Sequence, residues 1–246
     1  MKLSILVPAY NEAKTVGQLL DKVAKAPFPP AITDVELVVV DDCSTDGTDA
    51  ALAEWRRPSG SHPSLALVQH RQEVNQGKGA ALSRALKLAT GDLCLIQDAD
   101  LEYDPTDYPA LLSPLLSGQA DVVFGSRFLA GPHRVLFFWH QQGNRFLTTL
   151  SNAFTDLNLT DMETGYKAFT IDVARKLPMT SNRFGFEPEF TAYVARMGAR
   201  IYEVPISYHG RGYAEGKKIG WKDGVEALWC IVKFNVEARR KFRRMP

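Results

Sequence analysis

The 246-residue sequence has few cysteines and no long apolar run. Its cysteines, Cys43, Cys94 and Cys230, are far apart and match neither a disulfide framework nor a zinc-site spacing. Such lone cysteines suit a reducing compartment, where they are usually small core residues. No stretch approaches the roughly 18 apolar residues that span a bilayer, and the best candidate, ALWCIVKFNV, is interrupted by Lys233. We therefore expect no spanning segment, and expect any membrane contact to be peripheral.

The sequence also lacks a recognisable leader and a large excess of one charge. Its start, MKLSILVPAYNE, has one lysine and a short apolar run, which indicates a first strand. The net charge is +1, and no nucleic-acid-reading motif is present, so we expect no nucleic-acid partner. The charge is uneven, however, because ten Lys/Arg stand against four Asp/Glu from Arg211 onward.

The first half alternates between apolar runs and amphipathic segments. The apolar runs are rich in β-branched residues and nearly continuous, which is typical of parallel strands buried on both faces. Right-handed crossovers would join them into an open, mostly parallel α/β sheet with helices on both faces. The expected strands are 3–8, 35–40, 65–70, 92–97 and 120–126, and the expected helices are 12–25, 46–55, 78–89 and 108–116. In the second half, helical composition is clear only at 131–157 and 225–244.

Polar segments follow five of the expected strands. They read PAYNE, DDCSTDGT, QEVNQGKG, DADLEYDP and GSR in chain order. The carboxyl ends of parallel strands share one edge of the sheet, and ligands of such sheets bind there. This edge is therefore the candidate functional site.

The fourth of these segments concentrates negative charge. Asp98 and Asp100 are two positions apart, so extended backbone places them on the same face. Two close carboxylates repel unless a cation or proton lies between them, and carboxylate oxygens suit Mg²⁺ or Mn²⁺. Mg²⁺ takes one or two protein carboxylates and completes its shell with water and phosphate. The motif therefore predicts a metal–diphosphate site; the alternative is an acidic loop that caps the helix near Tyr108.

Three further rim residues have two interpretations each. Asp42 can accept from a base or a ribose hydroxyl, or it can cap the helix that begins near residue 46. Lys78 can approach a phosphate or base, with Gly77 and Gly79 allowing close backbone contact, or it can lie in an ordinary turn. Arg127 suits bidentate anion recognition, or it forms a surface salt bridge.

Together these motifs resemble a known family. VPAYNE, VVVDDCSTDGT, NQGKGAAL, QDADLEYDP and VFGSR resemble glycosyltransferase family 2 in order and spacing. GNRFLTTLSN, TDMETGYKAF, FGFEPEFTA and GRGYAEGKKIGWKDG are similar to polyprenyl-phosphate glycosyltransferases of the dolichyl-phosphate mannose synthase type. The resemblance covers residues 3–235 and implies a GT-A (Rossmann-like) fold, a nucleotide-diphosphate-sugar donor, a polyprenyl-phosphate acceptor, and Mg²⁺ or Mn²⁺.

The resemblance also implies roles for individual residues. Residues that line the nucleoside are Pro8, Tyr10, Glu12 and Asp42; those of the metal motif are Asp98, Asp100 and Glu102; basic residues near the phosphates are Arg127, Arg211 and Lys217. Asp161 matches an acidic residue near the acceptor. We take Asp161, Asp100 and Arg127 as catalytic candidates, and Lys78 as a further donor-binding residue.

The implied reaction is an inverting, single in-line displacement at the anomeric carbon. The metal and the basic residues would neutralise the leaving nucleoside diphosphate. A phosphate acceptor is already ionised, so Asp161 would then orient it; an alcohol acceptor needs a base, either Asp161 or Glu187. Alternatively, Asp161 caps a helix beginning in TDMET, and Glu187 and Glu189 are buried partners of Arg183 or Arg196.

Two departures from the wider family narrow the hypothesis. A Q-x-x-R-W motif is absent, which favours transfer of a single sugar. The membrane-spanning region that many bacterial relatives carry is also absent, so we expect a catalytic domain alone that attaches peripherally. We expect one domain over 1–246, with a donor half (1–127), an acceptor half (128–220) and a basic, amphipathic segment (221–246). GDP-mannose and UDP-glucose both fit as donors. The alternatives are a family 2 enzyme with a small or glycan acceptor, and a non-catalytic nucleotide-sugar-binding protein.

Two segments predict peripheral contact with the cytoplasmic face of a membrane. RVLFFWH and NRFLTTLSNAF carry large apolar side chains beside Arg134 and Arg145, and this pattern fits either core helices or an interfacial helix. The basic C-terminus suits an anionic surface, at about 1 kcal/mol per Lys or Arg, or is a solvated tail. The FFW segment can equally pair two subunits or meet a membrane protein.

Overall fold

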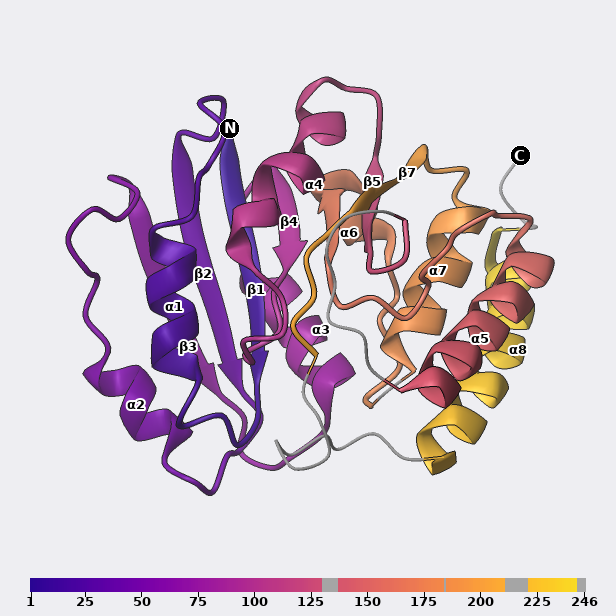
Figure 1. Cartoon of the computed structure of the whole chain (residues 1–246), viewed down its shortest axis with the longest axis horizontal. Coiled ribbons are helices and arrows are strands. Elements are labelled where there is room, and N and C mark those ends of the chain that lie inside the picture. The colour runs from indigo at the N-terminus through magenta and orange to yellow at the C-terminus, as the bar shows by residue number, and fades with distance from the viewer. Residues whose placement is uncertain (130–136, 184, 211–220, 243–246) are drawn as a thin grey trace.

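A computed structural model describes residues 1–129, 137–183, 185–210 and 221–242. Its centre is a seven-stranded sheet in the order β3-β2-β1-β4-β6-β5-β7 (Figure 1). All neighbouring strands are parallel except β6, which runs antiparallel to β4 and β5. The strands are β1 (Lys2–Ala9), β2 (Asp34–Asp41), β3 (Leu65–Arg71), β4 (Leu93–Ile96), β5 (Val122–Ser126), β6 (Lys167–Thr170) and β7 (Ile201–Pro205).

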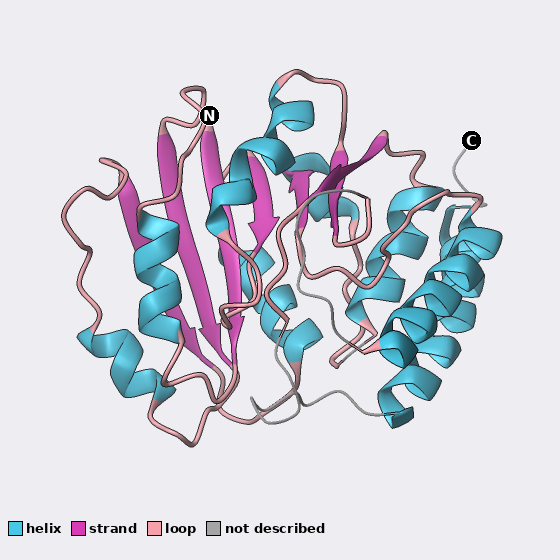
Figure 2. Ribbon diagram, viewed as in Figure 1, coloured by secondary structure: helices cyan, strands magenta, loops and turns pink. Residues whose placement is uncertain are grey.

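Helices cover both faces of the sheet (Figure 2). Those that join the first five strands are α1 (Val16–Ala24), α2 (Thr48–Glu54), α3 (Lys78–Leu88), the 3₁₀ turn η1 (Pro105–Asp107) and α4 (Tyr108–Leu116). Those of the second half are α5 (Phe138–Thr155), α6 (Ile171–Lys176), α7 (Phe186–Arg196) and α8 (Trp221–Phe242). The open, mostly parallel sheet with helices on both faces that the sequence predicts is confirmed.

Alternate residues of each central strand enter two separate cores. In β1, Leu3, Ile5 and Val7 pack with residues of α1 and α4, whereas Leu6 packs with residues of α3, α7 and α8 on the other face. A strand with both faces buried must be apolar at nearly every position. This requirement explains the continuous apolar runs of the sequence.

The second half contributes to the same sheet. Its β6 lies between β4 and β5, and β7 lies at the edge beside β5. The pattern did not predict β6, β7, α6 or α7. The helix expected at 131–157 is α5, although 131–136 lies outside the described residues, and the helix expected at 225–244 begins earlier, at Trp221. α5, α7 and α8 pack together at one side of the molecule (Figure 1).

The cysteines lie as the sequence indicates. Cys94 and Cys230 are buried, Cys43 is partly buried, and all three are free thiols. Among the described residues, no helix combines the length and apolar content that crossing a bilayer requires.

Candidate donor-binding and catalytic site

Asp42, at the end of β2, holds together the loop that follows β3. Its carboxylate accepts hydrogen bonds from Gln72 Nε2, from Asn75 Nδ2 at 2.9 Å, and from the backbone N–H groups of Gln76 at 2.9 Å and Gly77 at 2.6 Å. A carboxylate offers about four acceptor positions, and these donors fill them. The alternative role as a helix cap is wrong, because α2 begins after Gly47 without a side-chain cap. Contact of Asp42 with a nucleoside stays a prediction.

The loop after β1 lies beside this cluster. Pro8 is buried in β1, whereas Tyr10 is 42% exposed at the rim. Glu12 accepts a hydrogen bond from Thr15 Oγ1 at 2.6 Å. Of these three residues, Tyr10 is the one that presents a ring to solvent for stacking on a base. Their nucleoside-binding roles stay predictions.

Lys78 bridges two carboxylates instead of pointing to an open rim. Its Nζ lies 2.9 Å from Asp98 Oδ1 and 3.0 Å from Glu187 Oε1. Burial alone would lower the pKa of Lys78, but the charges of Asp98 and Glu187 raise that pKa well above its ordinary value. The alternative in which Glu187 and Glu189 pair with Arg183 or Arg196 is therefore wrong. Glu187 pairs with Lys78, and Glu189 accepts hydrogen bonds from Thr180 and Ser181.

The two glycines beside Lys78 make room for protein backbone. A Cβ on Gly77 would lie 2.4 Å from the carbonyl oxygen of Asn182, and one on Gly79 would lie 2.0 Å from that of Ser181. The N–H of Ala80 donates to Asn182 at 3.2 Å. The segment 181–182 thus closes over the start of α3 and brings Lys78 to α7.

The acidic motif after β4 splits into two environments. Asp98 faces inward to Lys78, whereas Asp100 Oδ1 accepts the backbone N–H of Glu102 at 3.1 Å. The Glu102 carboxylate accepts the hydroxyl of Tyr208 at 2.8 Å. A helix-capping role falls instead to Asp104, which accepts the N–H of Thr106 at the start of η1.

The donor chemistry fits a divalent cation bound through few carboxylates. In the described part of the chain, no cluster of three His, Cys, Asp or Glu side chains is arranged to hold a metal ion. Asp98 and Asp100 nevertheless offer the one or two hard oxygen ligands that Mg²⁺ takes when phosphates complete its shell. The ion pair of Asp98 with Lys78 shows that this carboxylate already sits against a cation. Glu102 as a third ligand stays a prediction.

Arg127, which follows β5, is held by a buried carboxylate. Its Nε and Nη2 donate to Asp161 at 2.6 and 2.7 Å, and its backbone N–H donates at 3.1 Å. Asn144 of α5 adds a fourth hydrogen bond at 3.0 Å. The Asp161 side chain is 0% exposed, and although burial alone would raise the pKa of Asp161, Arg127 holds it below its ordinary value. Two alternatives are therefore wrong: the pair is not a surface salt bridge, and no helix begins at Asp161.

A tight turn after Asp161 links Arg127 to Asp98. A Cβ on Gly165 would lie 2.3 Å from Asp98 Oδ2, and the Gly165 N–H donates to Tyr103 Oη at 2.8 Å. Lys167, fully buried, donates to the carbonyl oxygens of Met162 and Thr164 and so fixes the turn from inside. The turn brings the two ion pairs to one edge of the sheet.

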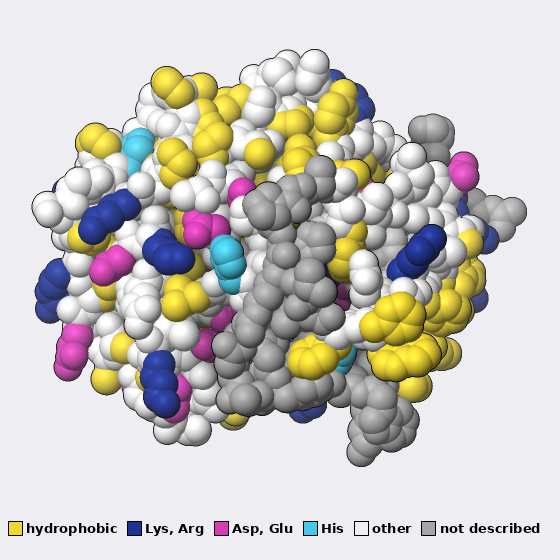
Figure 3. Space-filling view, viewed as in Figure 1, with side chains coloured by type: hydrophobic (Ala, Val, Ile, Leu, Met, Phe, Trp, Pro, Cys, Tyr) yellow, Lys and Arg dark blue, Asp and Glu magenta, His cyan; other side chains and the backbone are white. Residues whose placement is uncertain are grey.

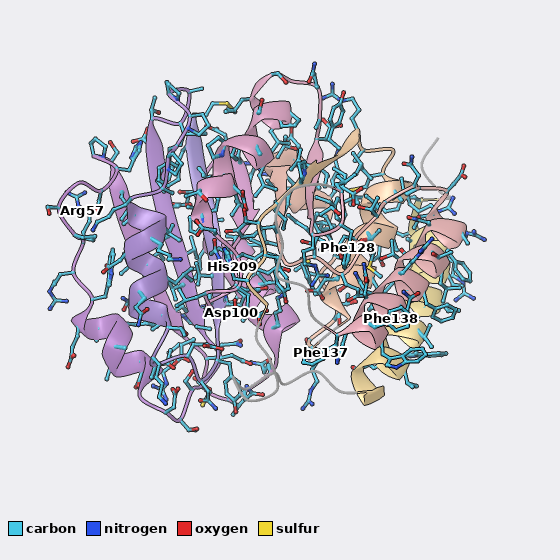
Figure 4. The ribbon with its side chains drawn as sticks, viewed as in Figure 1. Arg57, Asp100, Phe128, Phe137, Phe138 and His209 are labelled. Carbon is cyan, nitrogen blue, oxygen red and sulfur yellow. The ribbon has the colours of Figure 1, made fainter. Side chains whose placement is uncertain are left out.

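The segment before residue 211 contacts the acidic loop. The His209 N–H donates to the Glu102 carbonyl at 2.8 Å, and Figure 4 labels His209 and Asp100 on neighbouring segments. The guanidinium of Arg127 lies 5.1 Å from the Tyr208 ring centre. The predicted phosphate ligands Arg211 and Lys217 lie outside the described residues.

Comparison with known families agrees with this geometry. The sequence profile named Glycosyl transferase family 2 matches residues 4–177. The chain belongs to this family.

Among curated relatives of this family 2 chain, an undecaprenyl-phosphate mannosyltransferase of Micrococcus luteus is 30% identical over 250 residues, covering 97% of this chain and 96% of the relative. A dodecaprenyl-phosphate galacturonate synthase of Rhizobium johnstonii is 29% identical and covers 88% of this chain. This chain spans only 62% of that second protein's length.

Solved structures share the fold of this family 2 chain. A glucosyl-3-phosphoglycerate synthase from Mycobacterium tuberculosis superposes with a TM-score of 0.71 at 20% identity, covering 96% of this chain and 81% of that one. The same synthase in complex with Mn²⁺, UDP-glucose and phosphoglyceric acid gives 0.69 at 21% identity, with 96% and 80% coverage. At this identity the likeness shows the GT-A fold alone.

Several site residues of this family 2 chain carry no sequence signal of their own. Asn144, Tyr103 and Lys167 act through contacts with residues far along the chain. A lysine at the start of the short apolar run KAF was the available hint for Lys167, because a buried lysine needs backbone or carboxylate partners.

Proposed function

We propose that this protein transfers a single hexose from a nucleotide-diphosphate sugar to a polyprenyl phosphate, with inversion. The relatives that act on undecaprenyl and dodecaprenyl phosphate support the acceptor class. They carry different sugars, mannose and galacturonate by name, so GDP-mannose and UDP-glucose both remain donors to test.

The state of the carboxylates favours a phosphate acceptor. Asp161 and Glu187 were the two predicted bases, yet Asp161 is fully engaged with Arg127 and Asn144, and Glu187 is paired with Lys78. An alcohol acceptor would need a base within hydrogen-bond reach. A phosphate monoester is already ionised and needs none. This is the observation that carries the proposal.

Arg127 is the residue that we place against the substrate phosphates. Its bidentate pair with Asp161 uses Nε and Nη2, so the Nη1 edge has no acceptor among the described residues. A planar guanidinium held on one edge presents its other edge in a fixed direction, which suits phosphate oxygens. Asp161 is then a positioning residue for Arg127.

Asp98 and Asp100 are the proposed holders of Mg²⁺ or Mn²⁺, with Glu102 beside them. The bound ion would neutralise charge on the departing nucleoside diphosphate. Tyr10, Pro8, Glu12 and Asp42 frame the proposed nucleoside position, and we place Arg211 and Lys217 near the phosphates on the strength of the family motif. We further propose that residues 1–246 act as one catalytic domain, with the donor half, acceptor half and basic segment divided as the sequence predicts.

We also propose that an apolar face on α5 and α8 meets the membrane. This face consists of large exposed side chains: Phe138, Trp139 and Phe146 on α5, and Val225, Trp229, Val232 and Val236 on α8. Figure 3 shows hydrophobic side chains gathered over these helices. Leu147, Leu150 and Phe154 of the same segment pack against the core instead.

The charge beside the apolar face indicates an anionic leaflet. Arg239, Arg240 and Lys241 lie exposed in the last turn of α8. Anionic lipids of the cytoplasmic leaflet attract such residues, so the proposed location is the cytoplasmic face of a membrane. Pairing of two copies or docking on a membrane protein would cover the same face.

The test of function is transfer by purified protein with undecaprenyl or dolichyl phosphate, Mg²⁺ and a panel of labelled UDP- and GDP-sugars. We expect one sugar to enter the organic phase, only with metal present. Asp100→Ala should lose this transfer while keeping its thermal midpoint. Metal-dependent donor consumption that yields only a water-soluble product would contradict the lipid acceptor, and no consumption would favour a binding protein.

The test of the membrane face is co-sedimentation with anionic vesicles at low salt. Burial of a large apolar side chain contributes about 1.5–3 kcal/mol, so Trp139→Ala with Trp229→Ala should weaken partitioning at least tenfold. Tyr202→Ala, at an exposed site on β7, is the matched control. Equal binding by the double variant and the control would refute this face.

A further inference from the structure

Glu163 carries a buried carboxyl oxygen without a partner. Within the described residues, its Oε1 is shielded from solvent and makes no hydrogen bond. Asp41 and Asn144 each have one such atom too, but other atoms of those side chains are hydrogen-bonded. An unpaired buried acceptor costs about 1–3 kcal/mol, and each case in a folded protein needs a reason.

The position of Glu163 supplies that reason. It lies in the turn between Asp161, which holds Arg127, and Gly165, which packs against Asp98. After burial, the charge of Glu187 has the strongest influence on the pKa of this carboxyl, followed by the charges of Lys167 and Arg127. The turn that carries Glu163 therefore joins the pair formed by Arg127 and Asp161 to the group formed by Lys78, Asp98 and Glu187.

The chemistry of these flanks identifies the missing partner. Arg127 on one side and the Asp98–Asp100 motif on the other are the groups placed against phosphates and metal. A phosphate oxygen brings only acceptors and like charge to a carboxyl oxygen. A sugar hydroxyl brings a donor without charge, and the transferred sugar must lie between its diphosphate and the acceptor.

We propose that Glu163 Oε1 accepts a hydrogen bond from one hydroxyl of the transferred sugar and so selects which sugar is used. The inference rests on the proposed function, because it takes a nucleotide sugar as the donor. Burial, and then Glu187, raise the pKa of Glu163 to about 8. Near neutral pH the carboxyl is thus largely uncharged, and it does not repel the donor's diphosphate.

The experiment compares wild type, Glu163→Ala, Glu163→Gln and, as a control, Glu203→Gln on β7, which contacts the same turn. Glu203 accepts the backbone N–H groups of Thr160 and Asp161, so it supports the turn from outside. Each protein is assayed with UDP-glucose and GDP-mannose and with their 2-, 3-, 4- and 6-deoxy analogues. The readouts are kcat/KM, calorimetric Kd for each nucleotide sugar and for UDP or GDP alone, and the thermal midpoint.

A deoxy analogue would leave this buried acceptor unsatisfied, which costs about 1–3 kcal/mol, or roughly 5- to 150-fold in rate or affinity. We expect wild type to show this discrimination against one deoxy analogue, and Glu163→Ala to reduce it below about threefold. Glu203→Gln should keep the discrimination, and Kd for UDP or GDP alone should change less than about twofold in Glu163→Ala.

Two results with the variants would overturn the inference. One is full discrimination at every hydroxyl in Glu163→Ala. The other is an equal loss with all donors in Glu163→Ala and Glu163→Gln, which indicates a base or a structural role. The ratio of the calorimetric Kd values of a deoxy analogue and its parent nucleotide sugar can be measured without an acceptor. A failed lipid assay would therefore refute the proposed acceptor, while this ratio would still test the inference. Equal affinity of wild type for nucleotide sugars and bare nucleotides would refute it as well.

Discussion

Replacing Asp161 with Asn tests whether the buried pair with Arg127 is the support of the site. The substitution keeps the shape but removes the charge, and it leaves a guanidinium that is only 17% exposed without its counter-ion. Breaking a buried ion pair costs about 3–5 kcal/mol. Because Arg127 retains some solvent contact, the lower end of that range applies. For a chain of this size, about 3 kcal/mol corresponds to a fall of roughly 6–12 °C in the thermal midpoint.

The chain provides a matched control in Asp121 and Arg200. This pair has the same bidentate geometry, with 2.7 and 3.1 Å contacts, but its side chains are 30% and 56% exposed. An exposed pair contributes about 0–1 kcal/mol, so Asp121→Asn should lower the midpoint by less than about 4 °C. A double-mutant cycle with Arg127→Met and Arg200→Met isolates each pair. We expect a coupling above about 2 kcal/mol for the first and below about 1 kcal/mol for the second.

The effect has a defined pH dependence. The folded-state pKa of Asp161 is lowered, so the stabilisation by this carboxylate is present above the ordinary Asp pKa of about 3.9 and is lost as the pH falls through the folded value. The difference in thermal midpoint between wild type and Asp161→Asn should therefore become smaller at acidic pH. Equal melting of Asp161→Asn and Asp121→Asn at pH 7 would refute the reasoning.

Three further predictions follow from contacts around the site. Gly165→Ala should displace the Asp98 carboxylate, whose Oδ2 would lie 2.3 Å from the new Cβ, and lower transfer at least tenfold; Gly143→Ala, with nothing within 4 Å, should be harmless or stabilise α5. Lys78→Met should raise the Mn²⁺ affinity of the nucleotide-free protein several-fold, because the substitution removes the cation beside Asp98. Electron paramagnetic resonance measures this affinity, with Lys87→Met as the control; weaker Mn²⁺ binding by Lys78→Met than by the control would contradict the prediction. The pKa of Glu163 is raised from 4.5 to about 8, so its ionisation destabilises the folded protein as the pH rises through that window. The thermal midpoint of Glu163→Gln relative to wild type should therefore rise between pH 5 and pH 8.5, and a constant difference would disprove this.

The sequence predicts the first half of the fold well because burial on both faces leaves a local signature. Each run such as VELVVV matches a strand within one or two residues, and the polar rim follows from where those runs end. The second half lacks this signature. β6 has four residues and runs antiparallel to the strands on both of its sides. Neither the length nor the hydrophobic periodicity of this segment therefore identified it as a strand.

The sequence indicated which residues lie at the candidate site, but not which residues form ion pairs with them. Strand ends indicated Asp98, Lys78 and Arg127 as rim residues. Lys78 pairs with Glu187, 109 positions along the chain, and Arg127 with Asp161, 34 positions along. Such contacts depend on how the second half folds back over the sheet, and no local pattern in a single sequence encodes them. Glu163 was missed because an unpaired carboxyl is visible only when its surroundings are known.

The place of β6 in the sheet sets an order of assembly during synthesis. β5, at Val122–Ser126, has only β6 and β7 as neighbours, and both are made later in the chain. While a ribosome is still translating residues 127–166, strands β1 to β4 can pair, but β5 has an open edge on each side. Arg127 therefore gains its place only when β6 arrives and closes the sheet. A nascent chain released before that point would expose the apolar strand VVFGS and be prone to aggregate.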